Sequence, residues 1–514
     1  TEAKRLTGDA GNTKVLVDRS KKDTEAIFKY FHSDTRELSC DLLEDLYKET
    51  CQHKVLIFPN SRGRTEEIAV KLRRISDRVN GHKFYYSHHS SVDKEIRESI
   101  EHFAKNNERF NFCISCTSTL ELGIDIGTVD KIVQVDSTHS VSSLVQRIGR
   151  SGRREGERSI ANIYATDKWS LLQSLACWNL YKNEFIEPVV TAKKPFDILF
   201  HQMLSIVKQL SGCRRINLVS RLRTNPAFES IPENEINNLI DESVKSDYLE
   251  KIQHELILGI EGEKIVNSRE FYSVFKTEQN FKVIFSGKAI GDIPFSPQVK
   301  IDENLLLAAR VWKVIDIDFD GLKIIVIPAK DGKKPIFFGS GGNIHPKVRE
   351  EMLGILKSDE LYTELDESSK LILKELRYDF RNFKINDLVY DKPVIKKEDK
   401  LLLYTFTGTR INKSLSFLFN QAGCEAHLDE HSSSFEIEIN ETEFASLIEK
   451  VNQVFKRIDE FLITELKENK SLIGFSKWGI YLPVEYQSQI LKERYFDFAN
   501  AIALINNMKF IEPA

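Results

Sequence analysis

Apolar runs alternate with amphipathic segments over the first third of the chain. Short apolar or β-branched runs predict strands at residues 54–58 (KVLIF), 83–86 (KFYY), 109–115 (RFNFCIS), 131–135 (KIVQV) and 162–166 (NIYAT). Between them, apolar side chains recur at helical spacing, as Ile68, Leu72 and Ile75 do after the first run. Strands that alternate with helices indicate an α/β domain with a parallel sheet covered on both faces. Ligands of such sheets bind at the carboxyl ends of the strands, so the loops there are the candidate site.

The pattern changes near residue 190, and the rest of the chain predicts three further regions. An amphipathic helix at 195–210, a helix at 233–244 and short β-like pieces predict a winged-helix module at 191–280. Short strands separated by Asp-Gly pairs predict a β-rich domain at 281–345. Helices and strands alternate in residues 346–514, which we expect to form an α+β C-terminal region. The chain is thus expected to be multidomain, with the α/β domain at 1–190 first.

Composition excludes some classes of protein. The 514 residues include 73 Lys and Arg against 77 Asp and Glu, so nucleic-acid binding would have to come from local basic patches. No apolar stretch is long enough for a membrane helix, and seven cysteines make no disulfide framework. We therefore expect no membrane contact and a cytoplasmic location. The chain starts with Thr and lacks a signal-peptide pattern, so we expect a piece of a longer protein.

One segment concentrates positive charge. Five arginines lie in LVQRIGRSGRREGERS at 144–159, directly after an apolar helical stripe. Arg150 and Arg153 are three residues apart, so their guanidinium groups can reach the same side. Two forked guanidiniums suit a polyphosphate whose charge spreads during hydrolysis, which is the role of an arginine finger. A basic helix end with scattered surface salt bridges fits the same spacing.

A second candidate segment is the loop CTSTLELGIDIG at 116–127. The hydroxyls and backbone N–H groups of Thr117 and Ser118 suit a nucleic-acid phosphate at the end of a strand. Gly123 allows close backbone approach, and Asp125 brings a carboxylate to the sheet edge. The alternative to a binding loop is an ordinary strand–helix turn in which glycines allow the change of chain direction. We expect Cys113 and Cys116 to be buried strand residues rather than metal ligands, since no second Cys pair follows.

These segments resemble known helicase motifs. TSTLELGIDIG (117–127) resembles motif V, QRIGRSGRR (146–154) resembles motif VI, and LIFPNSRGRTEEIAVKL (56–72) resembles motif IV of superfamily 2 helicases. ELGIDIG, the HHSS loop at 88–91 and PFDILFHQML at 195–204 are most similar to the large helicase-related (Lhr) family. The resemblance covers nearly the whole chain from residue 54 and implies that residues 1–190 are the second RecA-like domain of such a helicase.

The resemblance implies roles for individual residues. Nucleotide-binding positions are matched by Gly123, Asp125, Gln146, Arg150 and Arg153. Arg150 and Arg153 are the implied catalytic residues near the γ-phosphate, and the two motif V residues link nucleotide and nucleic acid. Positions that contact the nucleic-acid strand are matched by Ser61, Arg62, His89, Ser90, Thr117 and Ser118. Ser90 stands where the family usually has glycine.

The chain departs from a complete helicase in one respect. It contains no G-x-x-x-x-G-K-[ST] loop and no DExH box. We therefore expect the first RecA-like domain, with the phosphate-binding lysine and the Mg²⁺ ligands, to lie upstream or on another polypeptide. The present chain would supply half of a shared ATP site and would not hydrolyse ATP alone.

The implied function is that of the C-terminal part of an ATP-dependent helicase. By resemblance it would move 3′ to 5′ on single-stranded DNA, or on a DNA/RNA hybrid, in DNA repair, with ATP and Mg²⁺ as cofactors. The alternative is a non-catalytic nucleic-acid-binding adaptor that retains the fold. A GKT loop and DExH box upstream of Thr1 would favour the motor, and a start codon there would favour the adaptor.

Overall fold

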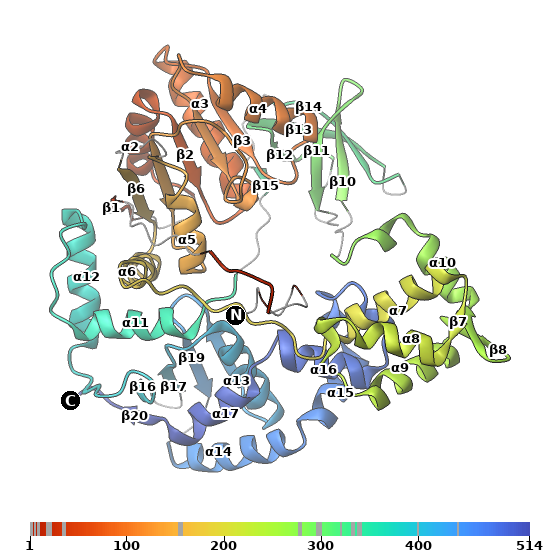
Figure 1. Cartoon of the computed structure of the whole chain (residues 1–514). Coiled ribbons are helices and arrows are strands. Elements are labelled where there is room, and N and C mark those ends of the chain that lie inside the picture. Colours follow the sequence, from red (N-terminus) through yellow and green to blue (C-terminus); the bar gives the residue numbers. More distant parts are fainter. Residues whose placement is uncertain are drawn as a thin grey trace.

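The computed structural model describes residues 4, 7, 11–16, 23–32, 37–152, 158–275, 280–294, 301–318, 321–329, 335–336, 342–397, 400–438 and 441–514. Figure 1 shows a parallel-sheet domain beside a small β-rich sheet, with a helical module and a mixed C-terminal region opposite them. The predicted multidomain architecture is confirmed: a parallel-sheet domain is followed by a helical region, a β-rich sheet and a mixed region of helices and strands.

The first domain is built on a six-stranded parallel sheet. Its strands lie in the order β1-β6-β5-β2-β4-β3. The strands are β1 (Thr24–Tyr30), β2 (Val55–Phe58), β3 (Tyr85–His88), β4 (Cys113–Cys116), β5 (Lys131–Val135) and β6 (Ser159–Ala165). They alternate with α2 (Cys40–Gln52), α3 (Arg62–Arg78), α4 (Lys94–Asn106), α5 (Val141–Ile148) and α6 (Lys168–Lys182). The predicted strand–helix alternation is thus present from β2 onward.

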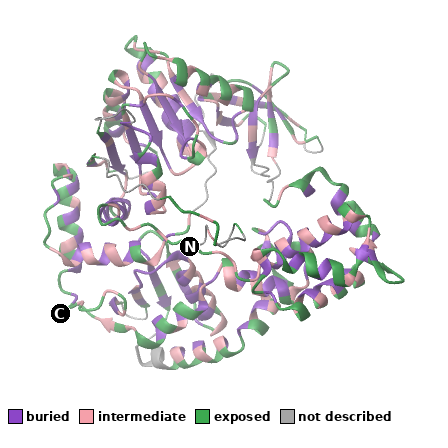
Figure 2. Ribbon diagram, in the orientation of Figure 1, coloured by how far each residue is buried: buried purple, intermediate pink, exposed green. Residues whose placement is uncertain are grey.

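Both faces of this sheet are covered. In β2, Leu56 and Phe58 belong to one buried cluster, whereas Val55 and Ile57 belong to another. Alternate residues of a strand point to opposite faces, so a run of four apolar residues requires helices on both sides. Figure 2 shows these central strands as the most continuous buried region of the domain.

The edge strand β1 was not predicted from the sequence. It pairs in parallel with β6, although Asp23 and Ser159, which begin this pairing, are 136 positions apart in the chain. Its other edge is occupied by residues near 365, because the Phe28 backbone N–H donates to the Glu364 carbonyl and the Asp366 N–H donates to the Phe28 carbonyl. These bonds satisfy an edge that would otherwise expose backbone groups.

The next region is helical and ends in a hairpin. It consists of α7 (Phe196–Leu210), β7 (Cys213–Arg214), α8 (Arg215–Arg223), α9 (Glu233–Lys245), β8 (Leu249–Ile252), β9 (Glu255–Leu258) and α10 (Ile260–Asn267). The three strands form a small antiparallel sheet in the order β7-β9-β8. The assignment of residues 191–280 as a winged-helix module stays a prediction.

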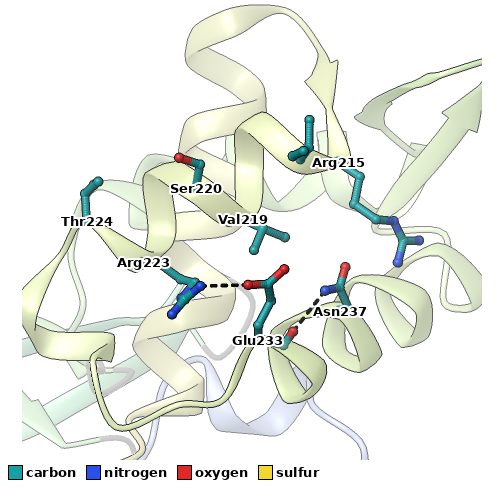
Figure 3. A pocket seen from close by; sticks show the side chains of 8 residues that line it. Arg215, Val219, Ser220, Arg223, Thr224, Glu233 and Asn237 are labelled. Atoms are coloured by element: carbon teal, nitrogen blue, oxygen red, sulfur yellow. Dashed lines mark hydrogen bonds and ion pairs between the residues drawn. The ribbon is translucent and has the colours of Figure 1, made fainter.

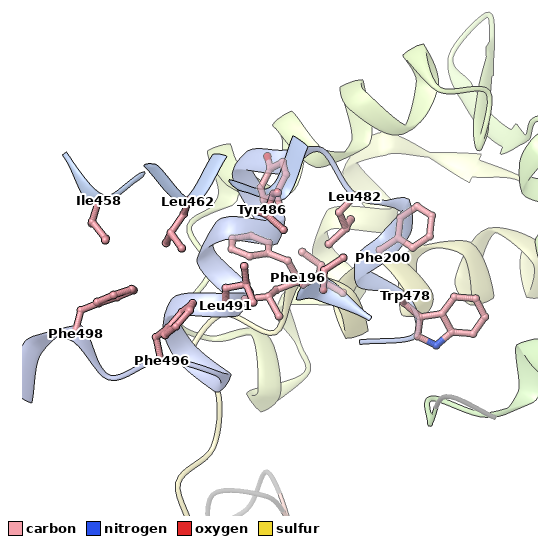
Figure 4. Close-up of a cluster of buried hydrophobic side chains, with 14 of the residues drawn as sticks. Phe196, Phe200, Ile458, Leu462, Trp478, Leu482, Tyr486, Leu491, Phe496 and Phe498 are labelled. Carbon is pink, nitrogen blue, oxygen red and sulfur yellow. The ribbon is translucent and has the colours of Figure 1, made fainter. Parts of the chain in front are cut away.

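This helical region shares its core with the end of the chain. Phe196 and Phe200 of α7 pack in one buried cluster with Trp478, Tyr486 and Leu491, as Figure 4 shows. The ring centroids of Phe196 and Tyr486 are 4.8 Å apart. The Asp197 carboxylate is buried at the same place and accepts hydrogen bonds from Ser476 and Arg494. The two segments are therefore held together by an apolar core and by an ion pair whose carboxylate is buried.

The β-rich sheet docks on the first domain. Its order is β11-β10-β14-β13-β12-β15. The strands are β10 (Asn280–Phe285), β11 (Lys288–Pro294), β12 (Asn304–Leu307), β13 (Arg310–Asp318), β14 (Lys323–Pro328) and β15 (Pro335–Ile336). Trp312 is buried in its core rather than exposed for base stacking. The turn between β12 and β13 contacts Glu66 of α3, because the N–H groups of Ala308 and Ala309 donate to the Glu66 carboxylate at 2.7 and 2.5 Å.

The remaining residues form two parts: a pair of helices that packs on the first domain, and a mixed region at the end of the chain. Helices α11 (Pro346–Lys357) and α12 (Glu367–Phe380) share a core with α6 of the first domain. The five-stranded sheet β18-β19-β17-β16-β20 and five helices follow. These are β16 (Asp391–Lys397), β17 (Lys400–Tyr404), α13 (Thr409–Gln421), β18 (Ala426–Asp429), β19 (Ser434–Glu438), α14 (Glu441–Lys456), α15 (Ile458–Glu468), α16 (Val484–Arg494), α17 (Phe498–Asn507) and β20 (Lys509–Ile511). In the described part of the chain, no helix is long and apolar enough to span a bilayer.

Candidate nucleotide and nucleic-acid interface

Three segments lie close together beside the parallel sheet. Strands β5, β2 and β4 are neighbours. The loops after β2 and β4 carry the predicted motif IV and motif V segments, and the predicted motif VI segment begins at Gln146 within α5, the helix after β5. The carboxyl ends of parallel strands lie at the same edge, where α/β sheets bind their ligands. The topology therefore brings the three segments together, although 85 positions separate Ser61 from Gln146.

Arg150 connects two of these segments. Its side chain is buried, and the residue is only 5% exposed. Nη1 donates to the Ile124 carbonyl and Nη2 to the Glu121 carbonyl, both at 2.8 Å. The guanidinium thus fixes the loop that contains the motif V residues, instead of projecting freely from the domain. Arg153 lies outside the described residues.

Arg147 forms a second link, which sequence reasoning did not assign. Its Nε donates to Glu121 Oε2 at 2.9 Å, and its Nη1 donates to Gln134 Oε1 at 2.6 Å. Its guanidinium carbon lies 5.3 Å from the centroid of the Phe58 ring. The spacing of residues along α5 could have predicted this position. Arg147 follows the buried Leu144 by three positions and so lies on the inward face of the helix.

The 117–127 loop exposes some of the predicted residues and buries others. Ser118 and Gly123 are exposed, whereas Thr117 is half-buried and donates its backbone N–H to the His88 carbonyl. Gly123 has φ +46° with no atom within 4 Å of the position of a Cβ. Asp125 is largely exposed and pairs with Lys105 at 2.9 Å. The turn thus presents open backbone at Gly123, beside a carboxylate held by α4.

The start of α3 holds Ser61 and Arg62. Ser61 is the N-cap residue, and its hydroxyl accepts the Arg64 backbone N–H at 3.1 Å. Arg62 donates from Nη1 to the Ser91 hydroxyl at 3.2 Å, which joins this loop to the HHSS segment. Gln146 is exposed on the outer side of α5. These residues do not converge on a single point.

His89 and Ser90 are placed differently from each other. Ser90 is exposed, whereas His89 is 2% exposed and its Nε2 lies 2.8 Å from Glu66 Oε1. Glu66 is the carboxylate that also holds the β12–β13 turn. In this structure His89 therefore contributes to the contact between the first domain and the β-rich sheet.

The neighbouring His88 is also enclosed. Burial is the main cause that lowers its pKa, although the hydrogen bond to Glu101 opposes the shift. Its Nε2 lies 2.8 Å from Glu101 and its Nδ1 lies 2.8 Å from the Thr119 hydroxyl. Across the described residues, no group of three or more His, Cys, Asp or Glu side chains is arranged to hold a metal ion. Cys113 and Cys116 are buried, as expected.

Comparisons with known proteins agree with this arrangement. The model of the helicase conserved C-terminal domain matches residues 36–155. The ATP-dependent helicase Lhr-Core of Methanocaldococcus jannaschii is 26% identical over 538 residues, covering 96% of this chain and 59% of the relative. The protein of that name from Saccharolobus solfataricus is 31% identical over 207 residues, covering 40% of this chain and 23% of the relative. The chain therefore spans less than two thirds of the length of these relatives.

One solved structure shares the fold over almost the entire chain. The structure of Mycobacterium smegmatis helicase Lhr bound to ssDNA and AMP-PNP superposes with a TM-score of 0.69 at 16% sequence identity. The match covers 99% of this chain and 72% of that chain. The two proteins therefore share their fold over this length.

Proposed function

From the membership of this chain in the Lhr family of superfamily 2 helicases, we propose that it supplies the second RecA-like domain and the following regions of an ATP-dependent helicase. The observation that carries the proposal is the meeting of the loops after β2 and β4 with the segment after α5, whose Arg150 donates to the carbonyls of Glu121 and Ile124. ATP would bind between the carboxyl edge of the parallel sheet and a first RecA-like domain, in cis or on a separate chain.

Arg150 is proposed to act both on the nucleotide and on the loop it now holds. A phosphate oxygen is a stronger acceptor for a guanidinium than a neutral carbonyl, because the bond is charge-assisted at both ends. ATP would therefore exchange the bonds to Glu121 and Ile124 for bonds to phosphate and release the 121–124 loop. We assign Arg153 a parallel role toward the γ-phosphate, and Gly123, Asp125 and Gln146 to the nucleotide side of the edge.

The described residues do not by themselves fit a Mg²⁺ ion, since no acidic or histidine cluster is available for it. We propose that the ion's ligands belong to the first RecA-like domain. The role of this chain toward ATP is then limited to binding and positioning by its arginines.

The nucleic-acid side is proposed to consist of the exposed groups of the same edge. Ser118 and Ser90 are accessible, and Arg62 and Ser61 lie at the start of α3. Thr117 and His89 are held by other groups and are assigned to positioning these loops. Further proposals are movement 3′ to 5′ along single-stranded DNA or a DNA/RNA hybrid, a role in DNA repair, a winged-helix identity for residues 191–280 and a cytoplasmic location.

The test is nucleic-acid-stimulated ATP hydrolysis by this chain together with a first RecA-like domain that contains a Walker A loop. Arg150→Ala should reduce turnover by about 10³-fold while nucleotide still binds. Arg150→Lys keeps the charge but not the fork and should recover only part of the rate. Arg78→Ala, at the exposed end of α3, is the control. Unchanged turnover in Arg150→Ala would refute the proposal.

A non-catalytic nucleic-acid-binding adaptor is the second candidate. It is favoured by one observation: Arg150 is already buried and bonded within its own domain, as a purely structural arginine would be. An adaptor would bind nucleic acid with an affinity indifferent to ATP analogues, even in the presence of the first RecA-like domain. A motor would change its affinity when the analogue binds.

A further inference from the structure

Charge is segregated along helix α8. Residues 214–223 contain four arginines and no acidic residue, whereas the following helix α9 carries Glu233, Glu235, Asp241 and Glu242. In a helix–turn–helix arrangement the second helix usually enters the groove of DNA. The one basic side chain of α9, Lys245, pairs with Glu242, and its other three carboxylates pair with Lys194, Arg215 and Arg223. The second helix therefore offers phosphate no positive charge that is not already paired.

The four arginines divide into two pairs. Arg215 pairs with Asp241, and Arg223 pairs with Glu233 at 2.7 Å, so these two are committed to holding α8 on α9. Figure 3 shows Arg223 reaching toward Glu233, while Ser220 and Thr224 point to the other side of α8. Arg214 and Arg221 are exposed and have no carboxylate partner within the described parts of the chain.

The outer side of α8 has the composition of a phosphate-binding stripe. Arg214, Asn217, Arg221 and Thr224 are exposed and follow one another at intervals of three or four residues, which places them along one face. With a rise of about 1.5 Å per residue, Arg214 and Arg221 are separated by about 10 Å along the helix axis. This spacing matches about three nucleotides of one strand of a duplex, at about 3.4 Å each.

The side chains of this surface favour a duplex over a single strand. Hollows of about 620 Å³ and 510 Å³ lie beside α8. The first is lined by residues of α8 and α9, and the second by residues around Arg214, Asn217 and Arg221 with Glu255. Single strands are bound largely by stacking of bases on aromatic side chains. The exposed face of α8 has none.

We propose that the outer face of α8, through Arg214, Asn217, Arg221 and Thr224, binds the phosphate backbone of duplex nucleic acid. This inference rests on the proposed function only in taking nucleic acid as the partner. It adds a second contact, away from the edge of the parallel sheet and selective for duplex. The apolar side of α8, with Leu218, Val219 and Leu222, is buried and anchors the helix.

The test is binding of the 514-residue chain to a labelled 20-base-pair duplex, a 20-nucleotide single strand and a fork that joins the two, followed by fluorescence anisotropy over a range of salt concentrations. The double variant Arg214→Glu/Arg221→Glu should weaken duplex binding about tenfold or more. It should also lower the slope of log K against log salt by about 1.8, because two phosphates are no longer neutralised. Binding of the single strand should change less than twofold.

The matched control is Lys245→Glu/Lys264→Glu, which changes the net charge equally. Both lysines are exposed and pair with acids of their own helices, α9 and α10. An equal loss in the control would mean that only the overall field matters, and would overturn the proposal, as would unchanged duplex binding in the α8 variant. If the wild-type chain binds duplex through α8 but does not bind the single strand, the result contradicts the proposed function and supports this inference.

Discussion

Replacing Glu66 with glutamine tests how the β-rich sheet is held on the first domain. The Glu66 residue is 1% exposed, and its two oxygens accept from Ala308 and Ala309 and contact His89. The two alanines have φ of 53° and 58°, a left-handed conformation that costs L residues about 1–2 kcal/mol each. The bonds to the carboxylate offset this cost, so the turn depends on the negative charge of Glu66.

The size of the effect follows from these contacts. Hydrogen bonds to a charged group contribute about 1.5–3 kcal/mol each. Glutamine keeps one acceptor oxygen but turns its NH₂ group toward a backbone N–H, so at least one bond is lost and one donor is left unsatisfied. We expect the docked arrangement to lose about 3 kcal/mol, which is roughly 150-fold in the equilibrium for opening.

Hydrogen exchange followed by mass spectrometry measures this opening directly. In Glu66→Gln, amides of β12, β13 and residues 89–92 should exchange faster by about that factor, while β2 and β5 keep their protection. Glu67→Gln is the matched control, because Glu67 is on the same helix and pairs with Arg64 and Lys71, both at 2.7 Å. Equal protection of β12 in wild type and Glu66→Gln would refute the reasoning.

Three further predictions concern single positions. Arg147→Met leaves the buried Glu121 carboxylate without its partner and should lower the free energy of unfolding by about 3–5 kcal/mol in urea denaturation; adding Glu121→Leu should recover much of this, and a strictly additive double variant would contradict the pairing. Gly127→Ala places a methyl group 3.1 Å from the Lys105 carbonyl at φ +75° and should destabilise the chain more than Gly123→Ala, which meets open space at φ +46°; equal melting temperatures would contradict this. Burial lowers the pKa of Lys392 from 10.5 to about 8, so the unfolded chain binds more protons between these values and stability rises with pH across that window. Lys392→Met should therefore stabilise the chain by about 3 kcal/mol at pH 7 and by much less at pH 10.5, and an equal gain at both pH values would argue against a buried charge as the cause.

The elements that local pattern could predict are those whose burial is complete or strictly periodic. β2 is apolar throughout because helices cover both of its faces, and the sequence VLIF shows this without further information. β1 has a weaker signal, because only Ala26 and Phe28 are fully buried in TEAIFKY, and its position depends on pairing with β6 much later in the chain. Pairing of this kind is decided by the assembled sheet and leaves little trace in the strand itself.

The candidate site was predictable as a set of loops but not as a set of contacts. Strand order brings the loops after β2 and β4 to one edge, and the βα pattern predicts that edge. The partner of each side chain depends on segments that no local pattern connects, as with His89 and Glu66 beneath a turn formed by residues 308 and 309. The same limitation hides the core shared by α7 and α16, in which Phe196 packs against Tyr486.

Arg150 shows what this difference means for function. The spacing of Arg150 and Arg153 in the sequence predicts a guanidinium that is available to bind a triphosphate. In the structure the Arg150 guanidinium already donates to two carbonyls in the 121–124 loop. A triphosphate and the two carbonyls would compete for the same N–H donors of Arg150. A nucleotide that binds Arg150 would therefore weaken the bonds that Arg150 makes to the 121–124 loop. Reciprocity of linkage then requires that anything which displaces the loop, including a nucleic-acid strand at Ser118, makes Arg150 more available to the nucleotide. If Arg150 acts on the nucleotide as proposed, its bonds to Glu121 and Ile124 couple the two ligands, because each ligand binds more tightly once the other has broken these bonds.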